Sequence, residues 1–113
     1  MDGSKAIVAH LTQELGCRVS TERPASPPDR MVTAVRLGGG GSMFRETSRY
    51  AIHAWAASEK DAYKLGMEAA EAMFSLPGSA PNVAHVEQDS FYSNIYPDGS
   101  PRWTGAYTII SNR

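Results

Sequence analysis

Residues 50–74, YAIHAWAASEKDAYKLGMEAAEAMF, change their periodicity at Ser58. Before Ser58 apolar side chains occupy both alternating faces, which is typical of a strand inside a sheet. After Ser58 apolar residues recur every three or four positions, which predicts an amphipathic helix. Ser58 suits a helix N-cap, and Asp61 follows as the acidic partner of a near capping box. The stretch therefore predicts a strand over residues 45–56 joined directly to a helix that ends near Leu76.

This predicted helix is apolar around more than half of its circumference. At about 100° per residue the apolar arc spans roughly 220°, whereas about 100° suffices for a helix that lies on a sheet. The flank expected to cover the sheet holds Ala62, Leu65, Ala69, Ala72, Met73 and Leu76. The second flank holds Tyr63, Met67, Ala70 and Phe74. It needs another cover, which is either the first helix or a neighbouring subunit.

Upstream, the pattern predicts a helix over residues 4–15, a short strand at 17–21, a proline-rich connector at 23–30 and a strand at 31–39. The run GGGGSMF, residues 38–44, is expected to be a flexible loop because fixing glycines costs about 1–2 kcal/mol each. A phosphate cradle is the alternative for this run, but no helix start or Gly-Lys-Ser/Thr ending follows it. We expect the loop to become ordered on assembly, with Met43 and Phe44 buried against a partner.

The C-terminal third predicts a long hairpin. Residues 82–96 and 102–113 are both strand-like, and PDGSP at 97–101 is a strong turn signal between them. Such a hairpin often projects past its sheet. The residues expected at its tip are Tyr96, Asp98, Arg102 and Trp103.

The composition is that of an ordinary single soluble domain. The chain has 113 residues, 20% charged and 42% hydrophobic, with a net charge of −1. We expect no sequence-specific nucleic acid as partner, because there is no basic excess. A single cysteine, Cys17, fits a reducing compartment, and the N-terminus does not resemble a signal peptide. We expect no membrane partner, since no run approaches the roughly 20 apolar residues of a membrane span.

Charge is distributed unevenly along the chain. Residues 1–57 hold seven Lys+Arg and five Asp+Glu, a balance of +2, and residues 58–113 hold four and seven, a balance of −3. Opposite ends of opposite sign would suit head-to-tail self-association. Chance scatter is the alternative, because the imbalance is small.

The sequence contains no pattern that points to catalysis, a cofactor or a metal. His10, His53 and His85 do not stand at metal-ligand spacing from one another or from Cys17. Glu87 and Asp89 share a strand face, as a carboxylate pair or as part of a solvated surface. The serines at 42, 58 and 90 lie in no Gly-x-Ser-x-Gly pattern. We therefore expect a protein that is not an enzyme, with no catalytic residues and no cofactor.

Taken in order, these features resemble the tail terminator proteins of long-tailed bacteriophages, also called tail completion or head–tail joining proteins. The resemblance covers nearly the whole chain. It rests on the short N-terminal helix and on the segments ERPASPPDRMVTAVRLGG, HAWAASEKDAYKLGMEA and YPDGSPRWTGAYTI. It implies an α/β (α+β) fold, in which a mixed, mainly antiparallel sheet of about four to five strands has two helices packed against it. The single domain would span residues 1–113 and end in the long hairpin.

The resemblance also implies a structural role in the virion. The chain would form a homo-oligomeric ring, usually a hexamer, that caps the tail tube at the tail–neck junction after synthesis in the bacterial cytoplasm. Its partners would be other copies of itself, the tail tube protein and a head-completion or neck protein. The alternatives are another neck component, such as a head-closure or connector protein, and a small ligand-binding α/β domain or enzyme. The residues expected at protein interfaces are Gly38, Gly39, Gly40, Gly41, Met43, Phe44, Tyr63, Met67, Phe74, Tyr96, Asp98, Arg102 and Trp103.

Overall fold

A five-stranded sheet in the order β1-β2-β3-β5-β4 forms the frame of the protein. The computed structural model describes residues 4–25, 28–80, 82–94, 97 and 99–112. Only β1 and β2 run parallel, and every other neighbouring pair is antiparallel. The mixed, mainly antiparallel sheet and its C-terminal hairpin are thus confirmed. The strands are β1 (Arg18–Ser20), β2 (Met31–Gly41), β3 (Arg45–Trp55), β4 (Val83–Ser93) and β5 (Arg102–Asn112).

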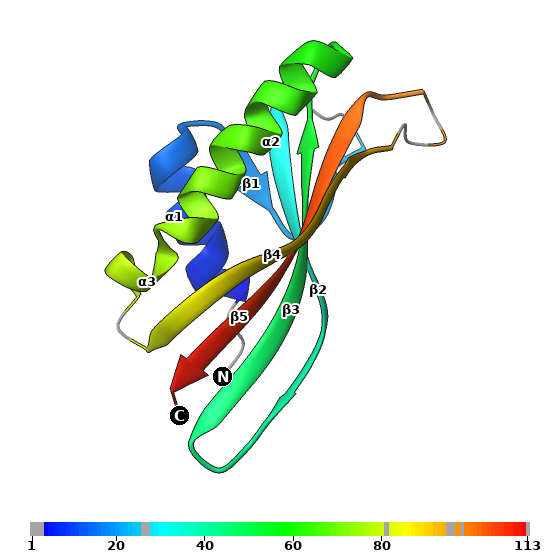
Figure 1. The fold of residues 1–113 in the computed structure, drawn as a ribbon. Helices are drawn as coiled ribbons and strands as arrows, with labels where there is room; N and C mark the ends of the chain where they lie inside the picture. Colours follow the sequence, from blue (N-terminus) through cyan, green and yellow to red (C-terminus); the bar gives the residue numbers. More distant parts are fainter. Residues whose placement is uncertain (1–3, 26–27, 81, 95–96, 98, 113) are drawn as a thin grey trace.

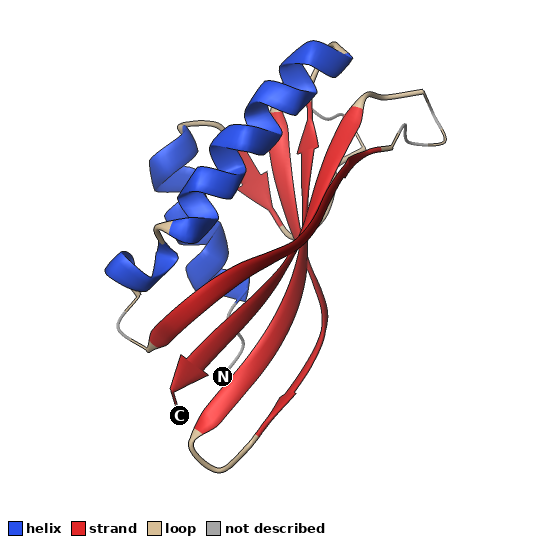
Figure 2. Cartoon of the chain, in the orientation of Figure 1, coloured by secondary structure: helices blue, strands red, loops and turns tan. Residues whose placement is uncertain are grey.

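The helices lie on one face of this sheet (Figure 2). They are α1 (Ser4–Leu15), α2 (Glu59–Phe74) and the short α3 (Leu76–Ser79). The six residues predicted to cover the sheet are all buried, five of them in α2 and Leu76 in α3. The helix predicted to end near Leu76 ends at Phe74, and α3 begins at Leu76. Among the described residues no helix is both long and apolar enough to cross a membrane.

Ser58 is the N-cap of α2, as the sequence predicts. Its backbone is extended, with φ −134° and ψ 160°, and its hydroxyl accepts a hydrogen bond from the backbone N–H of Asp61 at 3.2 Å. This bond satisfies one of the four amide groups that the first turn leaves without a helical partner. The cap fixes where the chain leaves β3 and enters the helix.

We expect Ser58→Ala to lower the free energy of unfolding by about 0.5–2 kcal/mol, because the capping acceptor is lost. Urea denaturation of the variant and the parent measures the difference. Ser58→Asp is the control and should retain most of the stability, since a carboxylate also caps well. Equal midpoints for the alanine variant and the parent would contradict the role of the cap.

The expectation of a flexible loop at residues 38–44 is wrong for the four glycines. They continue β2 and pair with β3, from Gly38 opposite Arg49 to Gly41 opposite Glu46. Gly41 has a φ of +150°, which side chains rarely adopt, and a Cβ on Gly39 would lie 2.5 Å from the carbonyl oxygen of Thr47. The glycines therefore permit a close approach of two backbones. The resulting β2–β3 arm extends beyond the helices (Figure 1).

The hairpin of β4 and β5 also differs from the projecting hairpin that the sequence predicts. β5 is an interior strand, paired with β3 along its whole length from Arg102 opposite Trp55 to Asn112 opposite Arg45. Arg102 and Trp103 consequently lie within the sheet and not at a projecting tip. Tyr96 and Asp98, the other two residues expected there, fall outside the described residues.

Candidate functional site

The tip of the β2–β3 arm exposes two large apolar side chains. Met43 is 80% exposed and Phe44 75%. The turn that carries them is closed, because the N–H of Ser42 donates to the carbonyl oxygen of Arg45 at 2.8 Å. Adjacent apolar side chains held outward in this way mark an interaction surface more strongly than a single exposed residue does.

The second flank of α2 forms another apolar surface. Tyr63, Met67 and Phe74 are 44%, 42% and 50% exposed. The first helix therefore leaves these three side chains exposed, whereas Ala70, the fourth member of the flank, is buried. α1 lies against the other side of α2, where Nε2 of His10 is 2.8 Å from the carbonyl oxygen of Ala72. The five-stranded sheet is wide enough for α1 to pack against β1 and β2, so α1 and α2 lie side by side on it.

Aromatic side chains from β4 and β5 partly cover this flank. The ring centroid of Tyr63 lies 4.8 Å from that of Trp103 and 6.0 Å from that of Phe91. Phe91 and Trp103 are 4.9 Å apart. A Cβ on Gly66 would lie 2.9 Å from the ring of Phe91, so the helix approaches the strands closely here. The structure thus brings Tyr63 and Trp103 together and adds Phe91, which no pattern in the sequence indicates.

A cavity of about 760 Å³ lies between α1, α3 and the ends of β3, β4 and β5. It was not predicted, since its walls come from five separate elements. Tyr50 lines it from β3 and is fully buried, and its hydroxyl has no hydrogen-bond partner among the residues that the structure describes. The apolar lining residues are Ala6, Ile7, Ala9, Leu76, Ala80, Val83 and Ile109. A buried hydroxyl without a hydrogen-bond partner carries a desolvation cost.

The sheet face opposite the helices holds a polar network around His53. Its Nδ1 lies 2.8 Å from Oγ1 of Thr104, and that hydroxyl donates to Oδ1 of Asn94 at 2.8 Å. The guanidinium of Arg102 lies 5.1 Å from the ring centroid of Trp55. Burial, and then the positive charge of Arg102, lower the pKa of His53 to about 4. Arg102 therefore interacts with Trp55 and His53 of its own subunit, and its expected role at an interface stays a prediction.

We expect the free energy of unfolding to fall by about 1–2 kcal/mol between pH 6.5 and pH 4, after allowance for solvent around the half-buried ring of His53. The folded-state pKa lies below the unfolded value, so in this window the unfolded chain binds the proton more readily. Urea denaturation across the window measures the slope, and His53→Gln should remove this share of it. An identical slope in the variant would contradict the assignment.

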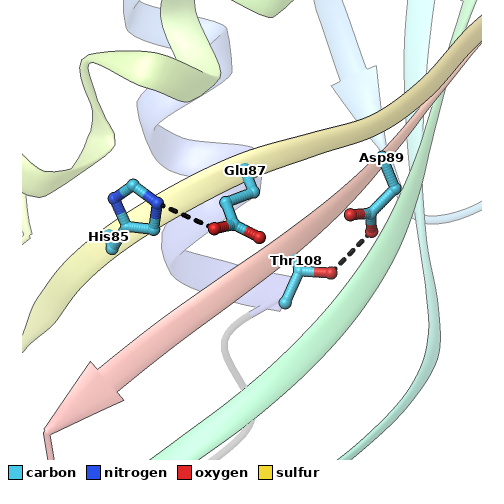
Figure 3. A network of polar contacts seen from close by, with 4 residues as sticks. All are labelled: His85, Glu87, Asp89 and Thr108. Atoms are coloured by element: carbon cyan, nitrogen blue, oxygen red, sulfur yellow. Dashed lines mark hydrogen bonds and ion pairs between the residues drawn. The ribbon is translucent and has the colours of Figure 1, made fainter.

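Glu87 and Asp89 make separate contacts on the exposed surface of β4 (Figure 3). Nε2 of His85 lies 3.2 Å from Oε1 of Glu87, and the hydroxyl of Thr108 donates to Oδ2 of Asp89 at 2.6 Å. The pairing with β5 shifts register at Asp89. This geometry favours the solvated strand face over a carboxylate pair. Within the described ranges, no three His, Cys, Asp or Glu side chains are grouped to hold a metal ion.

Comparison of the chain with models of known protein families and with curated proteins finds no match. The candidate site therefore rests on the geometry above. Some of the expected interface residues form two surfaces. Met43 and Phe44 form one at the arm tip, and the α2 flank forms the other together with Trp103.

Proposed function

We propose that the protein is a structural virion subunit that assembles as a ring on the end of a phage tail tube. The ring, expected to be a hexamer, stops polymerisation of the tube and offers a docking surface to the head or neck. The order of sequence features that resembles tail terminators supports this proposal. It involves no catalytic step.

The observation that carries the proposal is the presence of two separate apolar surfaces on one small chain. Met43 and Phe44 precede the first residue of β3, whereas α2 begins just after its last residue. The eleven residues of β3 place the start of α2 about 35 Å from the arm tip, at roughly 3.3 Å per residue, and the apolar flank runs back along the helix to Phe74, which packs on Tyr107 opposite Tyr50. A ring needs two different complementary surfaces on each copy, because its contacts are heterologous.

Electron microscopy of phage particles assembled without this protein tests the proposal. Tails of uncontrolled length beside unjoined heads are the expected result. Tails of normal length that fail to join heads would instead assign the protein to another neck component, such as a head-closure or connector protein. Complete, infectious particles would reject both roles.

A small ligand-binding domain is the second candidate, and the cavity beside Tyr50 is the observation that favours it. Native mass spectrometry of the protein purified from its host distinguishes the two. A monomer that retains a small molecule at every concentration would favour ligand binding. Oligomers of defined number that carry no small molecule would favour the virion subunit.

A further inference from the structure

The sheet ends on each side in a long strand edge. β1 pairs with β2 only from Met31 to Thr33, so the outer edge of β2 over residues 34–41 lies beyond β1. β4 forms the other edge of the sheet along the eleven residues Val83–Ser93. Within the part of the chain that the structure describes, no further strand pairs with either edge. Every second residue of such an edge directs its backbone N–H and C=O outward, which favours another strand as the partner.

The sequence of both edges permits such pairing. Natural edge strands are commonly protected by proline or lysine. The segments AVRLGGGG, residues 34–41, and VAHVEQDSFYS, residues 83–93, contain neither. The four glycines of β2 also have no side chains that would keep another strand at a distance. Both edges can therefore accept a strand from another molecule.

The two edges carry charges of opposite sign. Between residues 36 and 49 the β2–β3 arm holds three arginines and one glutamate, whereas β4 holds the exposed Glu87 and Asp89 and no lysine or arginine. Pairing of β4 with β4 of another copy would bring the acids together, and pairing of two arms would bring the arginines together. Like charges on paired strands are destabilising. Charge therefore selects β4 of one copy as the partner for the β2 edge of another.

The strand directions allow this pairing between copies of the same orientation. β2 and β4 run in opposite directions, because β2, β3, β5 and β4 are each antiparallel to the next. A neighbouring copy therefore presents its β4 antiparallel to β2, with the helices of both copies on the same face of the joined sheet. Such contacts are heterologous and can close a ring.

The register brings opposite charges together across the joined edges. One row of paired residues runs from Gly38 through Arg49 and Thr108 to Glu87. When the rows continue into the next copy, Glu87 of that copy lies opposite Gly38, and Arg49 lies one strand further on. Gly38 has no side chain, so the exposed Arg49 can extend over it to the carboxylate, across two strand spacings of together about 9–10 Å.

We propose that β4 of one subunit pairs antiparallel with residues 34–41 of β2 in the next subunit, so that their sheets join head to tail. The row that begins at Gly41 ends at Val83, which places the arm tip with Met43 and Phe44 beside the start of the neighbouring β4. The pairing rests on the self-assembly in the proposed function and names the strands that carry it.

Cysteine cross-linking between copies tests the pairing. Cys17→Ser removes the native thiol, and Gly40→Cys and His85→Cys place thiols in one row of the sheet. A Cβ on Gly40 meets nothing within 4 Å, and His85 is exposed. Within one chain β3 and β5 keep these positions about 14 Å apart, whereas paired strands bring Cα atoms to about 4.5–5.5 Å, where disulfides form. We expect a ladder of covalent oligomers that ends at the ring size.

The control joins Gly40→Cys to Ser90→Cys, an exposed residue about 16 Å further along β4. It should give no more cross-linking than Gly40→Cys alone. Native mass spectrometry of each unoxidised variant shows whether it assembles. Assembled protein in which the first pair cross-links no more than the control would overturn the pairing and leave the ring intact. A ladder that stops at the dimer would retain the pairing and reject the ring. Monomers at every concentration would reject both.

Charge reversal provides a second test, which isolates contacts between copies. Arg49→Glu and Glu87→Arg should each lower the association constant by about tenfold or more, because like charges then meet at the joined edges. A mixture of the two variants should associate with the two proteins alternating, since each offers an edge that complements the other. Each chain keeps its like charges within itself, so a restored contact must lie between chains. Native mass spectrometry identifies the mixed oligomers by mass, and a mixture that associates no better than either variant alone would overturn the pairing.

Discussion

Replacing both Met43 and Phe44 with serine is expected to abolish self-assembly and to leave the folded subunit intact. The two side chains are 80% and 75% exposed, so folding of the single chain gains little from them. Surface substitutions of this kind usually change the free energy of unfolding by less than about 0.5 kcal/mol. Burial in an assembly would stabilise it by roughly 1.5–3 kcal/mol for each side chain.

The expected loss is therefore about 3–6 kcal/mol per contact, which corresponds to an association constant lower by roughly 10²–10⁴-fold. Native mass spectrometry over a concentration series measures the association, and urea denaturation checks the fold. Leu37→Ser is the matched control, because Leu37 is also an exposed apolar residue of the arm but lies away from its tip. It should assemble like the parent. A double variant that forms rings at the parent's concentration would contradict the proposed surface.

Local signals in the sequence were sufficient for the elements around the strand-to-helix junction. Ser58 caps α2 because its hydroxyl serves an amide three residues away, and that contact needs no knowledge of the rest of the fold. The run of proline, aspartate and glycine at 97–99 similarly predicted that β4 and β5 pair as a hairpin. The exposure of Met43 and Phe44 could also be predicted, because they follow a run of glycines that has no side chains to cover them.

Features that depend on the order of the strands could not be predicted. The glycine run has low intrinsic strand propensity, yet pairing with β3 holds it in the sheet. The cover of the second α2 flank depends on β4 lying beside β5, which places Phe91 near Tyr63. Arg102 was expected at a hairpin tip because the sequence does not show that β3 pairs along the whole of β5. The cavity requires the complete fold.

Gly105→Ala is expected to destabilise the fold by about 1–3 kcal/mol, although alanine usually suits a strand better than glycine does. A Cβ at position 105 would lie 2.7 Å from Cε2 and from the hydroxyl oxygen of Tyr107. The ring of Tyr107 cannot move away easily. It is only 1% exposed, its hydroxyl accepts a hydrogen bond from Nε2 of Gln88 at 3.0 Å, and Phe74 packs against it.

Gly40→Ala is the matched control for this prediction. Gly40 is also a strand glycine, but a Cβ there would meet nothing within 4 Å and its φ lies outside the left-handed region. The control should leave the protein as stable as the parent or raise its free energy of unfolding by about 0.4–1 kcal/mol, because alanine restricts the unfolded chain. Urea denaturation of the three proteins therefore separates a general effect of replacing glycine from the contact with Tyr107. If Gly105→Ala were as stable as Gly40→Ala, the Tyr107 ring would not be fixed over β5, and the close packing of α2 on the hairpin would have to be revised.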